Sequence, residues 1–211
     1  MLVGIIDLGI NNLTSVNRAF SAPLRSTDSL VEIEANPKMD KPDLIILPGL
    51  GNFKAGMSAL REKKLVEIIK NWSSEGSKVV GICLGMQLLG TNSEESKGVE
   101  GLNLLPSRIK ALPEDQGERI PHTGWAETNL AFDSQPFSAF ATPGDFYFVH
   151  SYHLVPENEK DVLTRTPFGE YNFASSILCQ NILGFQFHPE KSGNKGKMLV
   201  SEIIEWARYE S

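Results

Sequence analysis

The sequence has few cysteines, no excess of positive charge and no long hydrophobic run. Its 211 residues include only two cysteines, Cys83 and Cys179, which are too far apart for a common metal-binding spacing or a disulfide framework. The 20 Lys and Arg residues are outnumbered by 26 Asp and Glu, giving a net charge of −6. This balance argues against sequence-independent binding of nucleic acid, and the two lone thiols fit a reducing compartment.

The sequence also lacks the pattern of a secretory signal or a membrane span. Its first residues carry no basic region, and Asp7 interrupts the apolar run early. The longest largely apolar stretch, Val79–Gly90, is shorter than the ~18 residues of a membrane span and contains Gln87. We therefore expect a cytoplasmic protein that binds neither membrane nor nucleic acid.

Short apolar runs alternate with helical patterns in the first half of the chain. A run with no polar residue predicts a strand buried on both faces, and Pro48-Gly49 is expected to end one of them. The expected strands are Leu2–Ile6, Leu30–Ile33, Asp43–Leu47 and Lys78–Ile82, and the expected helices are Asn11–Phe20, Asn52–Trp72 and Leu84–Thr91. This order is typical of a doubly wound parallel sheet covered by helices.

The second half contains short β-like segments separated by Pro, Gly and Asn. These segments are Arg108–Ala111, Phe146–Val149, Val162–Thr164, Tyr171–Ile177 and Leu183–Phe187, and a last helix is expected over Gly196–Tyr209. We expect them to extend the same sheet with antiparallel strands. The prediction is one α/β domain over residues 1–211, a three-layer sandwich whose mostly parallel central sheet is extended by antiparallel strands.

The sharpest local signal is the pentapeptide Gly81-Ile82-Cys83-Leu84-Gly85. It follows a predicted buried strand and precedes a predicted helix, which is the context of a nucleophile elbow. The two glycines would allow a strained turn that lifts the thiol out of the sheet, where helix N–H groups favour a thiolate and can hold an oxyanion. A buried structural cysteine beside packing glycines is the alternative, and the pentapeptide alone does not decide between them.

Among the four histidines, only His188 is followed two positions later by a carboxylate, Glu190. It ends an apolar run, and Pro189 is expected to stop the strand there. Glu190 could orient the imidazole by accepting its second N–H. A surface turn is the plain alternative, whereas a metal site lacks a third ligand nearby. With Cys83, these residues have the composition of a triad for covalent acyl transfer.

A third segment, Leu47–Phe53, is a glycine-rich loop between a predicted strand and helix. It contains no Gly-Lys-Ser/Thr and no complete dinucleotide fingerprint, so the signal for a phosphate site is weak. A second backbone N–H for an oxyanion is another use of such a loop, and a simple turn is the third.

Together these segments resemble the class I (triad) glutamine amidotransferases, and more closely the HisH family of glutaminase subunits. The matching segments follow the family's order along nearly the whole chain: Ile5–Val16, Leu47–Phe53, Gly81–Leu89, Ser93–Glu95, Pro121–Trp125, Tyr147–Tyr152 and Gln186–Ser192. That joint match strongly favours Cys83 as a nucleophile over a structural cysteine.

The resemblance implies hydrolysis of L-glutamine through a cysteinyl acyl-enzyme, with no cofactor and no metal. Cys83 would attack the side-chain amide, His188 would transfer protons and Glu190 would hold the imidazole ring. Backbone N–H groups that hold the oxyanion would come from Gly49, Leu50, Gly51 and Leu84. The residues that contact glutamine would be Gln87, Glu95, Ser151 and Tyr152. His150 is read as structural, and Cys179 as an ordinary apolar residue.

In this family the ammonia passes to a separate HisF-like (β/α)₈ synthase subunit, with which the chain would form a heterodimer making imidazole glycerol phosphate in histidine biosynthesis. The resemblance places Asn12, Trp125, Tyr147 and Lys191 at that interface.

The sequence departs from the family pattern mainly in the parts expected to face the partner. The family's opening motif Asp-Tyr-Gly-x-Gly-Asn corresponds to residues 7–12, where Leu8 replaces Tyr and Asn11 replaces Gly. The family's Gly-Trp-Asn motif has Ala126 in place of Asn, and the Phe-Glu pair after the nucleophile helix is replaced by Gly90-Thr91. The departures leave open a paralogue that supplies ammonia for amidino groups on bacterial surface sugars. A non-catalytic regulatory subunit is a further alternative, which the intact triad disfavours.

Overall fold

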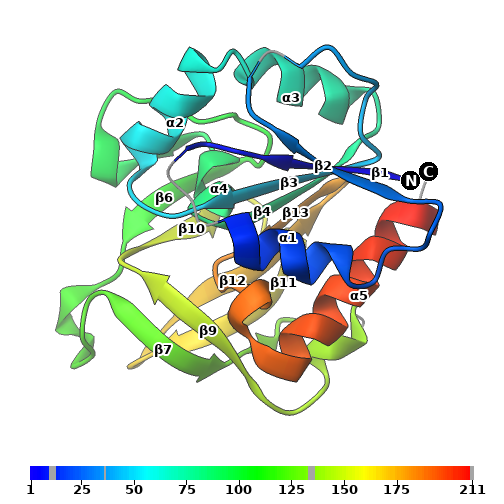
Figure 1. Ribbon diagram of the computed structural model, residues 1–211. Helices are drawn as coiled ribbons and strands as arrows, with labels where there is room; N and C mark the ends of the chain where they lie inside the picture. Colours follow the sequence, from blue (N-terminus) through cyan, green and yellow to red (C-terminus); the bar gives the residue numbers. More distant parts are fainter. Residues whose placement is uncertain (10–12, 36, 133–135, 210–211) are drawn as a thin grey trace.

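An eight-stranded mixed sheet forms the middle layer of the computed structural model, which describes residues 1–9, 13–35, 37–132 and 136–209 (Figure 1). Its parallel part contains, in spatial order, β2 (Ser29–Ile33), β1 (Leu2–Ile6), β3 (Leu44–Gly49), β4 (Lys78–Cys83) and β13 (Ile182–Phe185). The antiparallel part continues through β12 (Tyr171–Cys179), β11 (Val162–Phe168) and β8 (Asn129–Leu130). The predicted α/β class, with a mostly parallel sheet extended by antiparallel strands, is confirmed.

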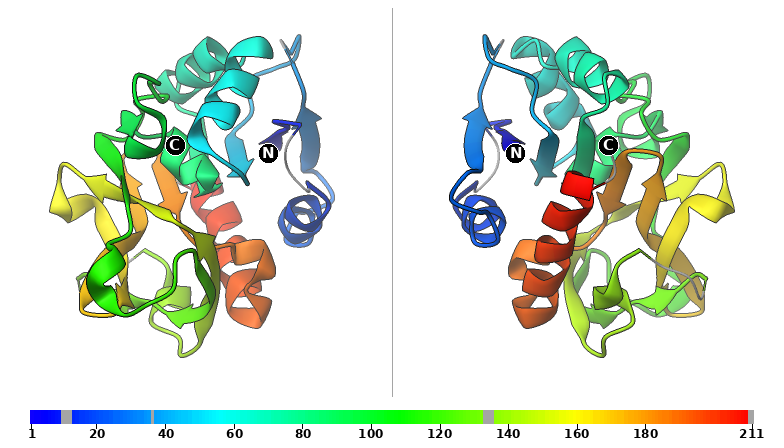
Figure 2. Two further views of the ribbon diagram at one scale, coloured as in Figure 1. Left: turned by 90° about the vertical axis from the view of Figure 1, so that its left-hand side faces the viewer. Right: turned by 90° about the vertical axis from the view of Figure 1, so that its right-hand side faces the viewer.

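Helices cover both faces of this sheet, as Figures 1 and 2 show. The helices α2 (Phe53–Glu62) and α3 (Val66–Ser74) lie over one face, whereas α1 (Leu13–Ser21) and α5 (Gly193–Tyr209) lie over the other. Successive residues of a strand point to opposite faces, so Val79 packs in one buried cluster and Val80 in the other. Because both faces are covered, every residue of β3 and β4 is buried, which explains the apolar sequence of β3 and of β4 after Lys78.

Two of the expected strands belong to separate small sheets, so the prediction that they extend the main sheet was wrong. The segment at Arg108 is β6 (Ser107–Ala111), which pairs with β5 (Asn92–Ser93) and β10 (Tyr152–Pro156). The segment at Phe146 is β9 (Asp145–His150), which pairs with β7 (His122–Glu127). Alternating hydrophobicity reports that one face of a strand is covered, but it does not identify the strand's hydrogen-bonding partner.

The single helix expected over Asn52–Trp72 is two helices, α2 and α3. Lys64 between them has a left-handed backbone, with φ of 57°. Leu60 and Leu65 are both fully buried although they are five residues apart, a spacing that one straight helix would place on different faces. The chain therefore turns at Lys64 and buries both side chains.

We expected the strand to stop before Pro48, at Leu47. In the structure, β3 includes Pro48 and Gly49 as its last two residues. Strand β1 pairs with β3 only as far as Ile46, so the end of β3 has a strand neighbour on one side only. A proline is tolerated where part of the hydrogen-bonding pattern is absent.

The nucleophile segment continues into a short helix, α4 (Leu84–Leu88), which ends before the expected Thr91. The remaining short 3₁₀ helices are Glu94–Ser96, Glu114–Gln116, Ser138–Phe140, Glu159–Asp161 and Pro189–Lys191. Within the described ranges, no helix is long and apolar enough to span a membrane.

Asp28 joins the start of the chain to its last helix. Its carboxylate accepts from the amino group of Met1 at 3.1 Å and from both terminal nitrogens of Arg208 in α5. The Asp28 side chain is 1% exposed. The Arg208 guanidinium holds the pKa of this carboxyl well below its usual range, so the ion pair is formed at neutral pH.

Candidate active site

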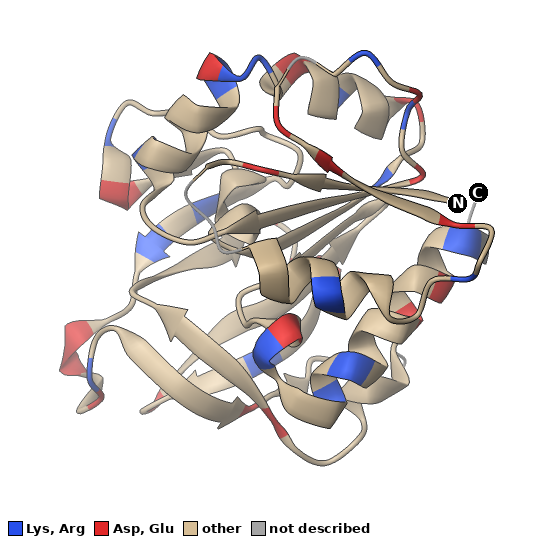
Figure 3. Cartoon of the chain, in the orientation of Figure 1, with Lys and Arg blue, Asp and Glu red and all other residues tan. Residues whose placement is uncertain are grey.

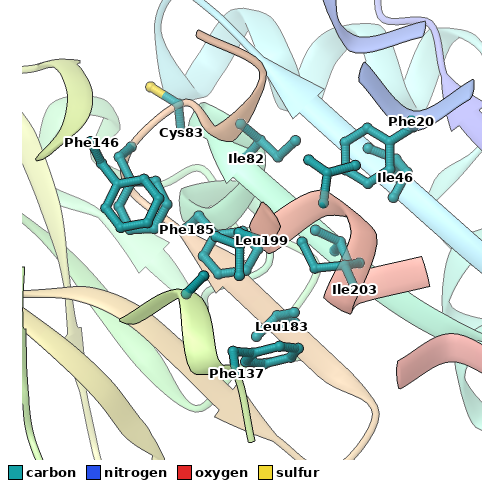
Figure 4. Packing of buried hydrophobic residues seen from close by; sticks show 14 of the residues in the cluster. Phe20, Ile46, Ile82, Cys83, Phe137, Phe146, Leu183, Phe185, Leu199 and Ile203 are labelled. Atoms are coloured by element: carbon teal, nitrogen blue, oxygen red, sulfur yellow. The ribbon is translucent and has the colours of Figure 1, made fainter. Parts of the chain in front are cut away.

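Cys83 occupies the turn between β4 and α4 in a strained conformation, with φ of 54° and ψ of −112°. We expected the glycines to carry this strain, but Cys83 itself carries it. The glycines are needed for close approach instead, because a Cβ on Gly85 would lie 1.7 Å from the carbonyl oxygen of Leu47. Figure 4 shows Cys83 at the margin of the apolar cluster, with its sulfur directed away from the packed side chains.

His188 and Glu190 form a buried pair at the 3₁₀ helix Pro189–Lys191. His188 Nδ1 lies 2.7 Å from Glu190 Oε1, and the two side chains are 4% and 3% exposed. Burial lowers the pKa of His188, but interactions with the side chains of Cys83 and Glu190 outweigh it and raise that pKa to about 9. This shift favours the charged imidazole, whose buried Nε2 makes no hydrogen bond to a described residue.

The backbone of His188 is fixed by β9. Its N–H donates to the carbonyl of Tyr147 at 2.8 Å. Ser192 completes the connection, because its hydroxyl donates to the carbonyl of His188 at 2.6 Å and accepts from the N–H of Tyr147 at 3.0 Å. The backbone of His188 thus has a defined position relative to β9.

A cavity of about 270 Å³ opens beside Cys83. It is lined by eight of the residues predicted from the sequence, Leu50, Gly51, Cys83, Leu84, Gln87, Glu95, Ser151 and Tyr152, together with Pro121, Val149 and His150. Glu95 also accepts from the backbone N–H of Phe53 at 2.7 Å, so it joins the cavity wall to the start of α2.

Gly49 lines a second cavity of about 170 Å³ on the side of His188. His188, Glu190 and Lys191 also line it, and Leu50 lies on both cavities. Gly49 is the register partner of Cys83 in the paired strands β3 and β4. The glycine-rich loop therefore lies between the two cavities, next to the thiol.

His150 lies at the wall of the first cavity, but both of its ring nitrogens have partners. Nδ1 is 2.9 Å from the carbonyl oxygen of Tyr152, and Nε2 is 3.1 Å from Nδ1 of His122. Burial, with a smaller effect of His122, lowers the pKa of His150 to about 3. Its neutral ring is part of a hydrogen-bonded chain that ends on the Tyr152 backbone.

One buried residue of the site, Gln186, was not predicted to have a role. Its Nε2 lies 3.8 Å from Cys83 Sγ, and its Oε1 lies 3.1 Å from Nε2 of Gln87. The sequence signals were a lone amide in an apolar run, two residues before His188, and its place at the start of the family-matching segment Gln186–Ser192.

An exposed aromatic patch lies on the β7–β9 pair. Trp125 is 56% exposed, and its ring lies 5.9 Å from that of Tyr147, its register partner. Lys191 Nζ lies 5.9 Å from the centre of the Tyr147 ring. In Figure 3 the charged residues of this ribbon lie only at its end, where Glu127 pairs with Asp145. Asn12, predicted to join this patch, lies outside the described residues.

No three His, Cys, Asp or Glu side chains of the described ranges are grouped in the manner of metal ligands. The groups brought together at the site are the thiol of Cys83, the imidazole of His188, the carboxylate of Glu190 and backbone N–H groups.

Comparison with known proteins identifies the family. Residues 6–206 match the model of the class I glutamine amidotransferases. The imidazole glycerol phosphate synthase subunit HisH of Aquifex aeolicus is 42% identical over 205 residues, which cover 94% of each chain. The corresponding subunit of Moorella thermoacetica is 40% identical over 210 residues, which cover 98% of this chain and 96% of the relative.

Solved structures agree on the fold. A crystal structure of a glutamine amidotransferase aligns with a TM-score of 0.71 at 18% identity and covers 98% of both chains. The PurLQS structure from Thermotoga maritima gives 0.71 at 20% identity, covering 97% of this chain and 98% of that one. From these matches, the chain belongs to the class I glutamine amidotransferase family and, within it, to the HisH subunits.

Proposed function

We propose that this chain hydrolyses L-glutamine at Cys83 and delivers the ammonia to a HisF-like (β/α)₈ subunit that makes imidazole glycerol phosphate. The observation that carries the proposal is the arrangement of a strained cysteine, a buried His188–Glu190 pair and a cavity beside the sulfur. The HisH names of the relatives favour the histidine pathway over the sugar-amidinating paralogue.

In the first half of the reaction, Cys83 Sγ attacks the side-chain amide carbon of glutamine. The protonated ring of His188 then gives a proton to the departing nitrogen, and ammonia leaves a thioester on Cys83. In the second half, neutral His188 takes a proton from water, whose oxygen attacks the thioester and releases glutamate. Glu190 keeps the ring oriented and stabilises its charged form.

Backbone N–H groups stabilise the oxyanion in both halves. Leu84 is the first residue of α4, so its N–H has no acceptor within the helix. The second N–H comes from the Gly49–Gly51 segment, which lies against the start of α4. Preorganised donors of this kind are typically worth about 3 kcal/mol each in the transition state.

The amino-acid end of glutamine is held by the far wall of the cavity. The Glu95 carboxylate pairs with the substrate ammonium, and the backbone of Ser151 and Tyr152 contacts the α-carboxylate end. Gln87 faces the substrate with its carbonyl oxygen, because its Nε2 already donates to Tyr152 O and Gln186 Oε1.

Ammonia leaves through the second cavity, between His188, Gly49 and Lys191. Lys191 also contacts the exposed aromatic patch, so this route leads toward the surface on which the synthase subunit docks. Release into a closed interface keeps ammonia unprotonated and nucleophilic. Trp125 and Tyr147 supply the apolar contact area that such an interface requires.

The test is to combine the chain with the histidine-pathway barrel of its own organism, glutamine and the nucleotide substrate of that barrel. We expect formation of imidazole glycerol phosphate, and slow glutamine hydrolysis by the chain alone. The physical reason is that the glycine-rich loop can turn its N–H away from the site until a partner fixes it.

Two outcomes would contradict parts of the proposal. Full glutaminase activity of the isolated chain would disprove control by the partner. Absence of a complex and product, with activity beside a sugar-amidinating enzyme instead, would assign the chain to the paralogue.

A further inference from the structure

The sulfur of Cys83 is contacted by a fully buried amide. Gln186 is 0% exposed and follows β13 directly, on the same segment as His188. Its Nε2 lies 3.8 Å from Cys83 Sγ, a length within reach of an N–H donor because sulfur is larger than oxygen. The thiol is thus approached by two polar side chains from one segment, the imidazole and this amide.

The orientation of this amide is determined by a chain of hydrogen bonds. The backbone carbonyl of Tyr152 can only accept, and Gln87 Nε2 donates to it at 2.8 Å. The second hydrogen of that NH₂ group is donated to Gln186 Oε1 at 3.1 Å. Gln186 therefore presents its own NH₂ group, and not its oxygen, to Cys83.

Rotation of either amide by half a turn would oppose like groups: turning Gln186 would bring its NH₂ group against that of Gln87, and turning Gln87 would bring two acceptors together. Turning Gln87 would oppose its Oε1 to the Tyr152 carbonyl, which also receives a hydrogen bond from His150 Nδ1 at 2.9 Å. Leaving a buried polar group unpaired costs about 1–3 kcal/mol. The Tyr152 carbonyl therefore fixes the orientation of the Gln87 amide, and the Gln87 amide fixes that of Gln186; we call this arrangement the lock.

The lock matters most when the thiol ionises. In its neutral form, Cys83 Sγ lies 3.7 Å from the carbonyl oxygen of Val149, which can accept the S–H. After ionisation the sulfur has no proton to donate and faces that carbonyl as a negative charge. An N–H pointed at the sulfur favours the ionised form, since hydrogen bonds to a charged acceptor are stronger than those to a neutral one.

We propose that Gln186 is a positioning residue of the nucleophile: its amide N–H, locked through Gln87 to the Tyr152 backbone, holds Cys83 Sγ and stabilises the thiolate. The inference rests on the proposed function in taking Cys83 as the nucleophile. It adds an amide donor that acts on the sulfur together with the charged His188.

The experiment measures the rate of alkylation of Cys83 by iodoacetamide as a function of pH. The full chain carries Cys179→Ala, so that only one thiol reacts, and the cavity beside Cys83 admits the reagent. Gln186→Met keeps the length of the side chain without an N–H, and Gln186→Glu keeps its shape without a donor when ionised. We expect both Gln186 variants to move the midpoint of the rate profile upward by about one pH unit, which is a tenfold higher proton affinity of the Cys83 thiolate. The plateau rate at high pH should stay the same.

Two further variants separate positioning from general destabilisation. Gln87→Met removes the lock but keeps Gln186, and we expect a smaller upward shift. Thr164→Val is the matched control, because Thr164 is also fully buried and its hydroxyl lies 2.9 Å from Ser175 Oγ on the neighbouring strand β12. The control should lose stability without moving the midpoint.

An unmoved midpoint in both Gln186 variants, with or without a lower rate at every pH, would overturn the inference. If those two variants do not fold, the Gln87→Met midpoint decides, and an unmoved value also overturns it. Glutamate release from glutamine by the complex with the synthase subunit tests the proposed function separately. A shifted alkylation profile without glutamate release would disprove the function and leave the role of Gln186 intact.

Discussion

Gly49 and Cys83 face each other across the parallel strands β3 and β4, at the last register position of the pair. A Cβ on Gly49 would lie 2.6 Å from the backbone nitrogen of Gly85 and 2.7 Å from Cβ of Leu84. The loop and the first turn of α4 can approach this closely only because residue 49 has no side chain. The relative position of thiol and loop depends on that contact.

Replacing Gly49 by Ala should therefore displace α4 from the loop and lower glutaminase kcat. Misplacement of about 1 Å at a reacting centre typically costs about 100-fold, and we expect a loss of that order. Gly117→Ala is the control for backbone strain away from the site, since Gly117 has a φ of 72° but nothing surrounds its Cβ position. Equal kcat for Gly49→Ala and the wild type would show that this contact does not position the site.

Replacing Cys83 by Ala should abolish glutamine hydrolysis, because no other group in the site can form the thioester. Synthesis driven by added ammonium salts should persist in the complex with the synthase subunit, since that reaction takes place on the partner. Cys179→Ala, on β12, should leave turnover within a few-fold. Glutamate release by Cys83→Ala would eliminate the mechanism.

Replacing His188 by Asn should lower glutaminase kcat by about 10²–10⁴, because activation of the thiol and protonation of the departing amide nitrogen both fail. Glu190→Gln should cost less, since Glu190 orients the ring and transfers no proton. His150→Asn is the comparison, because it removes a second buried ring near the cavity. A larger kcat loss at His150 than at His188 would reassign the base.

His150 should make the fold sensitive to acid. Its pKa is lowered from 6.5 to about 3 in the folded state, so the unfolded chain binds more protons between those values. The contribution of neutral His150 to the free energy of unfolding is complete above pH 6.5. It declines as the pH falls toward 3, by up to about 1.4 kcal/mol per pH unit.

Urea unfolding at several pH values between 7.5 and 4.5 measures this effect. The wild type should lose stability faster than His150→Phe as the pH falls, and the difference between the two isolates His150 from the other titrating groups. Parallel stability curves would show that His150 is not the source of the acid sensitivity.

Asp28→Asn should destabilise the fold by about 1–3 kcal/mol at neutral pH, because it leaves Arg208 and the Met1 amino group without their carboxylate. The pKa of Asp28 is lowered by Arg208, so the stability it gives is present above about pH 3.8 and is lost as the pH falls below that value. Asp40→Asn, at an exposed position, is the control in thermal unfolding. Equal Tm values for Asp28→Asn and Asp40→Asn at neutral pH would contradict the prediction. A Tm difference between Asp28→Asn and the wild type that stays the same below pH 3.8 would also contradict it.

The parallel core of the fold could be predicted because its strands are buried on both faces. Such strands appear as uninterrupted apolar runs, and β1 and β4 were located from them nearly to the residue. The break at Lys64 could not be predicted, since neither glycine nor proline marks it and tertiary burial of Leu60 and Leu65 determines the turn. The pairing of β6 and β9 outside the main sheet was also missed, because partner choice is not encoded in alternation.

The positions that line the site were predictable to the extent that a local motif carries each one. Cys83 ends β4 between Gly81 and Gly85, and His188 directly precedes Pro189 at the start of a 3₁₀ helix, so glycine or proline marks both positions in the sequence. Gln186 carries no such mark. Its place against the sulfur follows from the parallel register of β13 with β4, and its orientation follows from Gln87 and Tyr152, which are distant in sequence.

The hydrogen bond between the N–H of His188 and the carbonyl of Tyr147 has a mechanical consequence for any protein that binds the aromatic patch. The ring of Tyr147 lies in the aromatic patch beside Trp125, while its backbone carbonyl accepts the hydrogen bond from His188. A displacement of Tyr147 would reach His188 through this backbone hydrogen bond. Ser192, which is hydrogen-bonded to the backbone of both residues, supports the same connection. A partner that shifts the half-buried Tyr147 would therefore also shift the backbone of His188.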